Sequence, residues 1–136
     1  MTCWQIAKPN SQSWGPDMDR NYDLSRLCLF TGTEHYHRLN RLCLLTDGAK
    51  YLAEGAGAFW LMDAAASYLI ELGTSDWFVQ IRLVVTGSSA VLTLEDGNGH
   101  IRARQAIPYT DFPIPHYTLY ACWNGEAWVI MLTSEY

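Results

Sequence analysis

The chain has 136 residues, of which 49% are hydrophobic and 17% are charged, and its formal net charge at pH 7 is −5. This length is typical of one domain with a hydrophobic core of normal size. The acidic balance argues against sequence-independent binding to nucleic acid, which requires a basic surface. No apolar run approaches the length of a membrane span.

The cysteine pattern and the first residues favour a reducing compartment. Cys3, Cys28, Cys43 and Cys122 are widely spaced and include no C-x-x-C pair. The first residues, MTCWQIAKPN, lack the apolar centre of a signal peptide. Without a secretory signal, reduced thiols are favoured over disulfides. We therefore expect a cytoplasmic protein.

The beginning of the chain predicts an irregular arm. Residues 1–22 are polar and contain prolines and glycine, so we divide the chain into this arm and a single domain at 23–136. Asp23 is suited to cap a short amphipathic helix from Leu24 to about Phe30.

The stretch at 47–73 predicts two helices separated by a glycine break. A weak helix is expected at Ala49–Glu54, and a long one at Ala58–Leu72, where nearly every residue is apolar or a strong helix former. Asp63, Ser67 and Glu71 are spaced four residues apart and form one narrow polar stripe. The apolar remainder is wide, so we expect this helix to be packed on at least two sides.

The residues after Gly73 change to the alternating pattern of strands. The expected strands are Trp77–Thr86, Ala90–Glu95, His100–Ile107, Tyr117–Trp123 and Ala127–Thr133. A further short strand is expected near Leu42–Thr46. We predict an α+β fold, in which an antiparallel meander of about five strands packs on the long central helix, with one or two short helices.

The alternation also assigns side chains to faces. In the third expected strand, Ile101, Ala103, Gln105 and Ile107 are placed inward, and Arg102 and Arg104 outward. Near the end of the chain, apolar and aromatic side chains occupy both faces of the predicted sheet, so a second copy or a partner is expected to supply cover.

Motifs for catalysis or metal binding are weak. The segment EDGNGH resembles part of a calcium loop, but its spacing places Leu94 at the first ligand position, so it predicts a hairpin turn. His35 and His37 could bind a metal with Glu34 or a distant cysteine, yet no third ligand is spaced to confirm such a site. We expect no metal, no cofactor and no catalytic residue.

A set of motifs resembles a protein family. These are FTGTEHYHR at 30–38, TDGAKYLAEGAGAFWLMD at 46–63, EDGNG at 95–99 and YTDFP at 109–113. Together they resemble a family of small bacterial and phage proteins described only as a domain of unknown function, over about residues 24–136. The resemblance implies an intracellular setting and a bacterial or mobile-element origin, and it assigns no catalytic residues.

We therefore predict a non-enzymatic protein-binding module that forms a homodimer. A finer hypothesis is that it inhibits a host defence or regulatory protein, using an acidic face to compete for a basic groove. The candidate partner-binding residues are Thr31, Thr33, Glu34, His35, His37, Arg38, Asp111, Phe112, Tyr120 and Trp128. The candidate acidic face consists of Asp17, Asp19, Asp23, Glu95 and Asp96.

Two other hypotheses remain. The alternative is a small enzyme or ligand-binding protein that uses Glu34, His35, His37 and Asp111. The third is binding of single-stranded nucleic acid through Arg102 and Arg104 with exposed aromatic side chains, which the acidic net charge disfavours.

Overall fold

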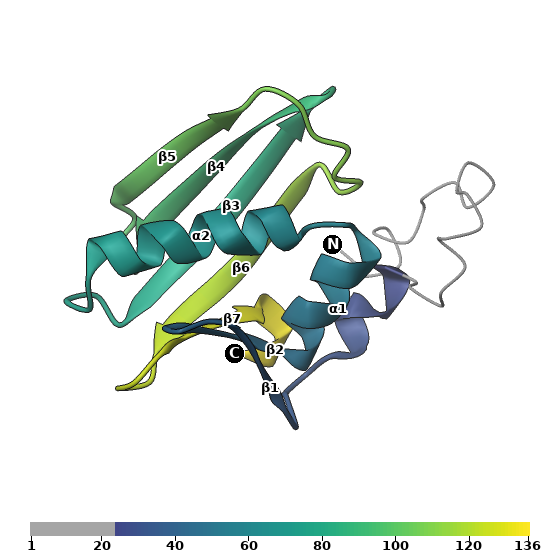
Figure 1. Ribbon diagram of the computed structural model, residues 1–136. Helices are drawn as coiled ribbons and strands as arrows, with labels where there is room; N and C mark the ends of the chain where they lie inside the picture. Colours follow the sequence, from purple (N-terminus) through teal and green to yellow (C-terminus); the bar gives the residue numbers. More distant parts are fainter. Residues whose placement is uncertain (1–23) are drawn as a thin grey trace.

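The computed structural model describes residues 24–136 and shows an α+β fold, with a long helix across one face of a mixed sheet (Figure 1). The predicted arm at 1–22 and Asp23 lie outside the described residues. The elements are the 3-10 helix η4 (Leu24–Leu29), β1 (Tyr36–Asn40), β2 (Cys43–Thr46), α1 (Asp47–Gly55), α2 (Phe59–Leu72), β3 (Phe78–Thr86), β4 (Ser89–Asp96), β5 (Ile101–Ile107), β6 (His116–Trp123), β7 (Trp128–Leu132) and the 3-10 turn η5 (Thr133–Glu135).

The sheet has seven strands in the order β1-β2-β7-β6-β3-β4-β5. This order contains six pairs of neighbouring strands, and of these only the pair of β2 with β7 is parallel. The predicted five-strand meander is wrong in its order, because the connection at 108–115 returns the chain across the sheet to place β6 beside β3. The predicted short strand at 42–46 is present as β2, and it extends this sheet beyond β7.

β1 was not expected from the sequence. Its residues, YHRLN, are mostly polar, and as an edge strand it is only partly buried. Such a strand lacks the apolar alternation that marks a half-buried strand in a sequence. Its position depends instead on antiparallel pairing with β2.

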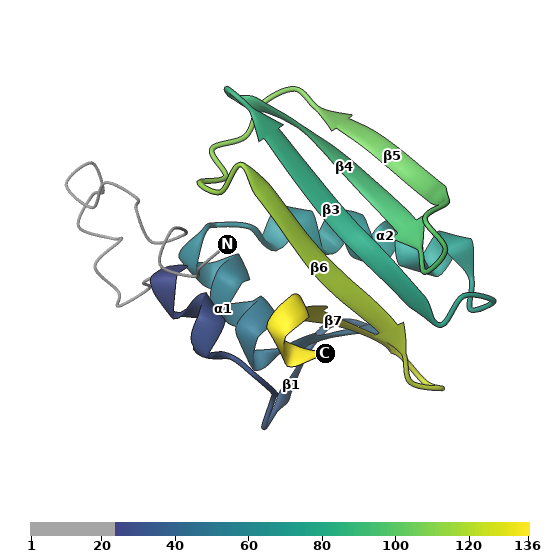
Figure 2. The same ribbon diagram turned by 180° about the vertical axis from the view of Figure 1, so that it is seen from behind.

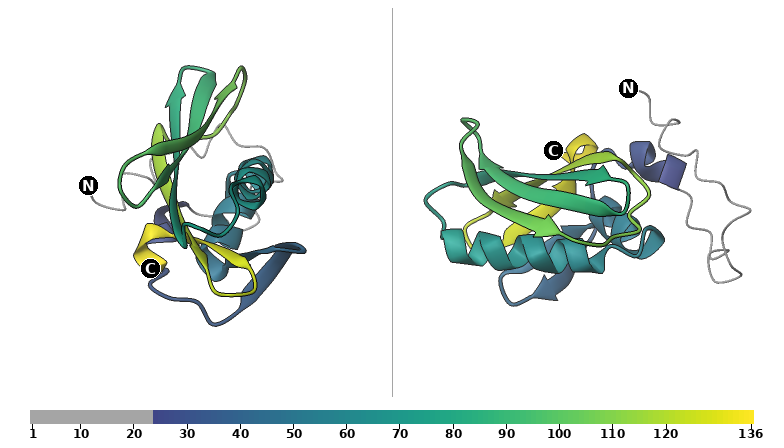
Figure 3. Two further views of the ribbon diagram at one scale, coloured as in Figure 1. Left: turned by 90° about the vertical axis from the view of Figure 1, so that its left-hand side faces the viewer. Right: turned by 90° about the horizontal axis from the view of Figure 1, so that it is seen from above.

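The core lies between α2 and the inner face of the sheet (Figure 3). Leu61, Ala65 and Leu69 of α2 are buried, and Ile81 and Leu83 belong to the same hydrophobic cluster from the β3 side. The predicted polar stripe of α2 is confirmed, since Asp63, Ser67 and Glu71 are all exposed. Two apolar side chains, Phe59 and Ile70, are also exposed, so α2 is less covered than its composition suggests.

The C-terminal tail packs against the beginning of α1. The carboxylate of Glu135 accepts hydrogen bonds from the Gly48 amide at 3.0 Å, the Leu132 amide at 2.9 Å and the Thr46 hydroxyl at 2.6 Å. Thr46 also caps α1 by accepting from the Ala49 amide. An anion at this end of a helix satisfies unpaired amides and complements the helix dipole.

None of the helices within residues 24–136 has the length and apolar character needed to cross a membrane.

Candidate functional site

The segment before β1 is organised by one carboxylate, that of Asp47 at the beginning of α1. Its Oδ1 lies 2.7 Å from His37 Nε2, and its Oδ2 accepts hydrogen bonds from the backbone amides of Glu34 and His35. The Thr33 hydroxyl also joins this segment to α1, because it donates to the His35 carbonyl and accepts from the Asp47 amide. These bonds, above all the one to His37, lower the pKa of Asp47 from 3.8 to about 2.

Asp47 is not among the sequence-predicted candidates, and the helix at this position was expected to begin only at Ala49. The signal that could have identified it is a threonine cap followed by an acidic residue in the first helical turn. The structure gives Thr33 and His37 a role in local folding. Among the other candidates of this region, Thr31, Glu34, His35 and Arg38 are exposed, and the Arg38 guanidinium donates to the carbonyls of Asn40 and Arg41.

Asp111 lies in a different part of the molecule from these residues. Its neighbour Thr110 donates its amide to the Ser88 carbonyl, which attaches the connection at 108–115 to the β3–β4 turn. The segment at Thr33–His37 instead leads into β1, at the other edge of the sheet. The predicted grouping of Asp111 with Glu34, His35 and His37 is therefore not formed in the described chain.

Two of the predicted partner-binding residues, Trp128 and Phe112, are buried, so their assignment to a binding surface is wrong. Trp128 is 1% exposed because its side chain belongs to the core cluster, and its ring packs at 5.8 Å from that of Trp123. Phe112 is 4% exposed and belongs to the core cluster, where it packs against Tyr117. Both aromatic side chains stabilise the core and are inaccessible to a partner in this fold.

The two described members of the predicted acidic face are already paired. Glu95 forms an ion pair with Arg82 at 2.9 Å. Asp96 accepts from the amides of Asn98 and His100 and lies 3.2 Å from the His100 ring, which closes the β4–β5 hairpin. These bonds lower the pKa of Asp96. Asp17, Asp19 and Asp23 lie outside the described residues.

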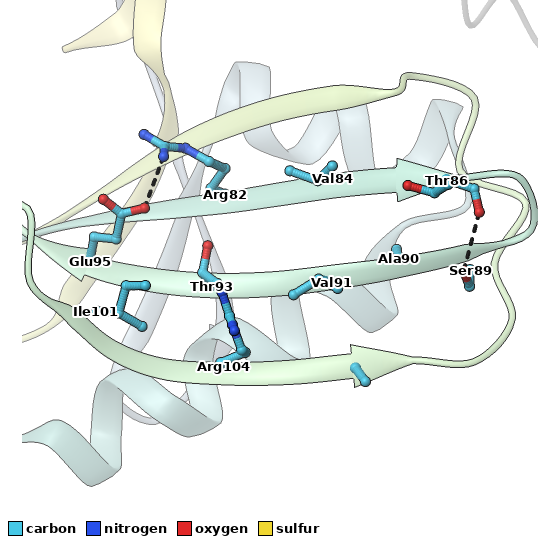
Figure 4. Close-up of a pocket in the computed structure, with 11 residues that line it drawn as sticks. Arg82, Val84, Thr86, Ser89, Ala90, Val91, Thr93, Glu95, Ile101 and Arg104 are labelled. Atoms are coloured by element: carbon cyan, nitrogen blue, oxygen red, sulfur yellow. Dashed lines mark hydrogen bonds and ion pairs between the residues drawn. The ribbon is translucent and has the colours of Figure 1, made fainter.

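Figure 2 shows the outer face of the sheet, opposite α2. Over β3, β4 and β5 this face carries an open depression of about 510 Å³, and its lining side chains are drawn in Figure 4. We name this surface the open face. Its defining residues are Arg82 and Val84 of β3, Val91 and Glu95 of β4, and Ile101 and Arg104 of β5.

Strand register explains why these side chains share one face. Thr93 pairs with both Arg82 and Arg104, and Val91 pairs with Val84, and side chains directly opposite in a sheet point to the same side. The outward position predicted for Arg104 is thus confirmed.

The inward position predicted for Ile101 is wrong. The register shifts between Leu94 and Glu95, so that Glu95 pairs with Ile101 while Leu94 pairs with Ala103. This irregularity inserts one extra residue, Arg102, and moves Ile101 to the outer face. Ile101 is consequently 54% exposed. Arg102 itself forms an ion pair with Asp76.

The open face continues into an aromatic cluster at one end of β3. Phe78 packs against Trp77, Tyr120 and Tyr136, with ring centroids 5.8, 5.0 and 5.3 Å apart. Tyr120 pairs with Gln80, two residues from Phe78, which puts both rings on the same side of the sheet as Arg82. Tyr120 is therefore a sequence-predicted candidate that the structure places on the open face. Trp77 is 60% exposed.

The chemistry of the open face is suited to binding. It combines the apolar side chains of Val84, Val91 and Ile101 with the Arg82–Glu95 pair and with Arg104. Within residues 24–136, no ion pair or side-chain hydrogen bond involves Arg104. The thiol of Cys122 lies farther along β6, and burial raises its pKa. A protonated thiol of this kind is a poor nucleophile.

Comparison with known proteins places the chain in a family without an assigned activity. A family model described as a family of unknown function (DUF6876) matches residues 22–136. This confirms the resemblance to a domain of unknown function. No curated protein and no solved structure matches the chain significantly.

Proposed function

We propose that this chain, which belongs to DUF6876, a family of unknown function, is a non-enzymatic protein-binding module. Its partner docks on the open face. The proposal rests on the structure. The observation that carries this proposal is a sheet face that no other element within residues 24–136 covers, with an apolar centre and arginines beside it.

The composition of the open face favours a protein partner. Val91 is 39% exposed, and with Ile101 it forms an apolar surface next to Arg82 and Arg104. Arginine, tyrosine and tryptophan are enriched at the residues that contribute most to protein–protein binding. The aromatic cluster extends the same face. The depression is open to solvent along the strands (Figure 4), whereas sites for small molecules enclose most of their ligand.

The finer hypothesis of an inhibitor of a host protein rests on the sequence resemblance alone. The three described cysteines are free thiols, and free thiols favour a reducing compartment such as the cytoplasm. The idea of an acidic face receives no support from Glu95 and Asp96, since both carboxylates are paired within the chain.

The test compares single charge substitutions on the two sides of the molecule. Val91→Asp and Ile101→Asp place a carboxylate on the open face, and Ile70→Asp makes the same change on the exposed stripe of α2. Each tagged protein is used for capture from nuclease-treated lysate of the native host, with bound proteins identified by mass spectrometry and folding checked by circular dichroism.

We expect one stoichiometric protein with the wild type and with Ile70→Asp, and its loss with both open-face variants. The proposal is wrong if the folded open-face variants retain the same protein, or if no protein is captured by the wild type.

A further inference from the structure

We infer that the partner of the open face binds as an added β-strand along the outer edge of β5 and presents an acidic side chain to Arg104. This inference rests on the proposed function and specifies the chemistry of the partner. It combines three observations on β5: its free edge, its register and its charge.

The edge of β5 is accessible. β5 is the last strand in the sheet order, and Ile101, Arg102, Arg104, Gln105 and Ala106 are exposed. α2 lies over the inner face of the sheet (Figure 1), and its Tyr68 hydroxyl donates to Gln105 Oε1 of β5 at 3.0 Å. An edge strand has a row of backbone N–H and C=O groups without a strand partner, and an extended peptide can pair with that row.

The register fixes which side chains of the added strand would meet the open face. Side chains directly opposite in neighbouring strands are about 5 Å apart. A carboxylate opposite Arg104 is therefore within reach of the guanidinium and can form a bidentate, charge-assisted pair. The next side chain on the same face would lie beside Ala106, which favours an apolar residue two positions away.

The positive charge of Arg104 favours an acidic partner strand over a second copy of this chain. If two β5 strands paired antiparallel about Arg104, the two guanidinium groups would face each other, and like charges in opposite positions destabilise a strand pair. A positive charge on an edge strand is one of the devices by which sheet edges avoid self-association. The same charge favours an acidic strand as the occupant of this edge.

The experiment uses a displayed library of random peptides of about nine residues, a length that covers one strand. The library is selected on the full-length wild-type protein. Binding of the enriched peptides is then measured on Arg104→Glu and on Arg41→Glu, a matched charge reversal in the turn between β1 and β2, at the other edge of the sheet. Amide hydrogen exchange of residues 101–107 is followed with and without peptide.

We expect enriched peptides with Asp or Glu, apolar residues two positions away and no internal proline. Their affinity should fall about tenfold with Arg104→Glu, a change of about 1.4 kcal/mol, and stay unchanged with Arg41→Glu. Exchange in β5 should slow when peptide binds, because the added strand protects its outward amides.

The inference is wrong if no peptide is enriched, if the enriched peptides lack acidic residues, or if binding leaves β5 exchange unchanged. Concentration-dependent protection of β5 without peptide would show a second copy at this edge, and that result also overturns it. If the peptide experiment fails while Val91→Asp and Ile101→Asp still abolish capture, the proposed function stands and only strand addition is wrong. If capture is unaffected as well, both are wrong.

Discussion

At the scale of single residues, Asp47 links the segment before β1 to the beginning of α1. One carboxylate contacts the His37 ring and accepts two backbone amides, at Glu34 and His35. Hydrogen bonds to a charged acceptor are stronger than those to a neutral one. An acidic residue is also favoured in the first turn of a helix. The charge of Asp47 is therefore part of its structural role.

Asp47→Asn should lower the free energy of unfolding at pH 6 by about 1–2 kcal/mol, because the amide retains the shape but loses the charge. The pKa of Asp47 is lowered to about 2, so its contribution is complete above pH 4 and is lost as the pH falls towards 2. Urea unfolding of both proteins between pH 6 and pH 2 measures this. The difference between them should shrink as the pH falls.

The control for this pH series is Asp63→Asn, on the exposed stripe of α2, which should change stability by less than about 0.5 kcal/mol. A wild-type advantage over Asp47→Asn that remains constant from pH 6 to pH 2 would contradict the role of the charge.

At the scale of elements, the beginning of α1 requires space for Glu135. A Cβ placed on Gly48 would lie 2.5 Å from Glu135 Oε1 and 2.6 Å from Leu132 Cδ1. The absence of a side chain thus allows the carboxylate to reach the Gly48 amide and the Thr46 hydroxyl. The helix and the tail depend on each other through this contact.

Gly48→Ala should therefore destabilise the protein by about 1–3 kcal/mol, since the new methyl group displaces Glu135 or Leu132. Gly32→Ala is the matched control, because no atom lies within 4 Å of a Cβ at that position. Thermal unfolding followed by circular dichroism compares the two. Equal melting temperatures for the two variants would show that the Glu135 contact contributes little.

Elements whose burial is decided by local pattern were predictable from the sequence. The polar stripe of α2 and the hairpin at Asp96–Gly99 follow from spacing and turn residues, and both are present. The placement of β6 beside β3, and of β7 beside β2, depends on contacts between residues far apart in the chain. Periodicity carries no information about such neighbours, which is why the predicted strand order was wrong.

The candidate site was predictable only in part, for a similar reason. Tyr120, Glu95 and Arg104 were identified, and they lie on the open face or at its end. Val91 was not singled out because a half-exposed valine in a strand looks like any core position. Ile101 was assigned to the wrong face because a bulge leaves no reliable mark in one sequence.

At the scale of the whole molecule, β7 joins two parts of the sheet. On one side it pairs in parallel with β2, which carries β1, and on the other it pairs antiparallel with β6, which leads to β3, β4 and β5. Its residue Trp128 is buried between these parts. Loss of packing at this position should weaken the entire domain at once.

Trp128→Ala should lower the free energy of unfolding by about 3–5 kcal/mol, the usual cost of removing a large buried aromatic side chain. Trp77→Ala removes the same side chain from an exposed position and should cost far less. Urea unfolding monitored by fluorescence and by circular dichroism measures both. Separate transitions for the two signals in Trp128→Ala would argue against one cooperative unit.

The position of β7 also has a consequence for synthesis on the ribosome. β7 follows all the other strands in the chain, yet it occupies the middle of the sheet. Until Leu132 has emerged, the nascent chain holds two apolar strand edges, on β2 and β6, that have no partner. Such edges are the surfaces that chaperones protect and that aggregate when left open. The sheet can therefore close only after Leu132 has left the ribosome.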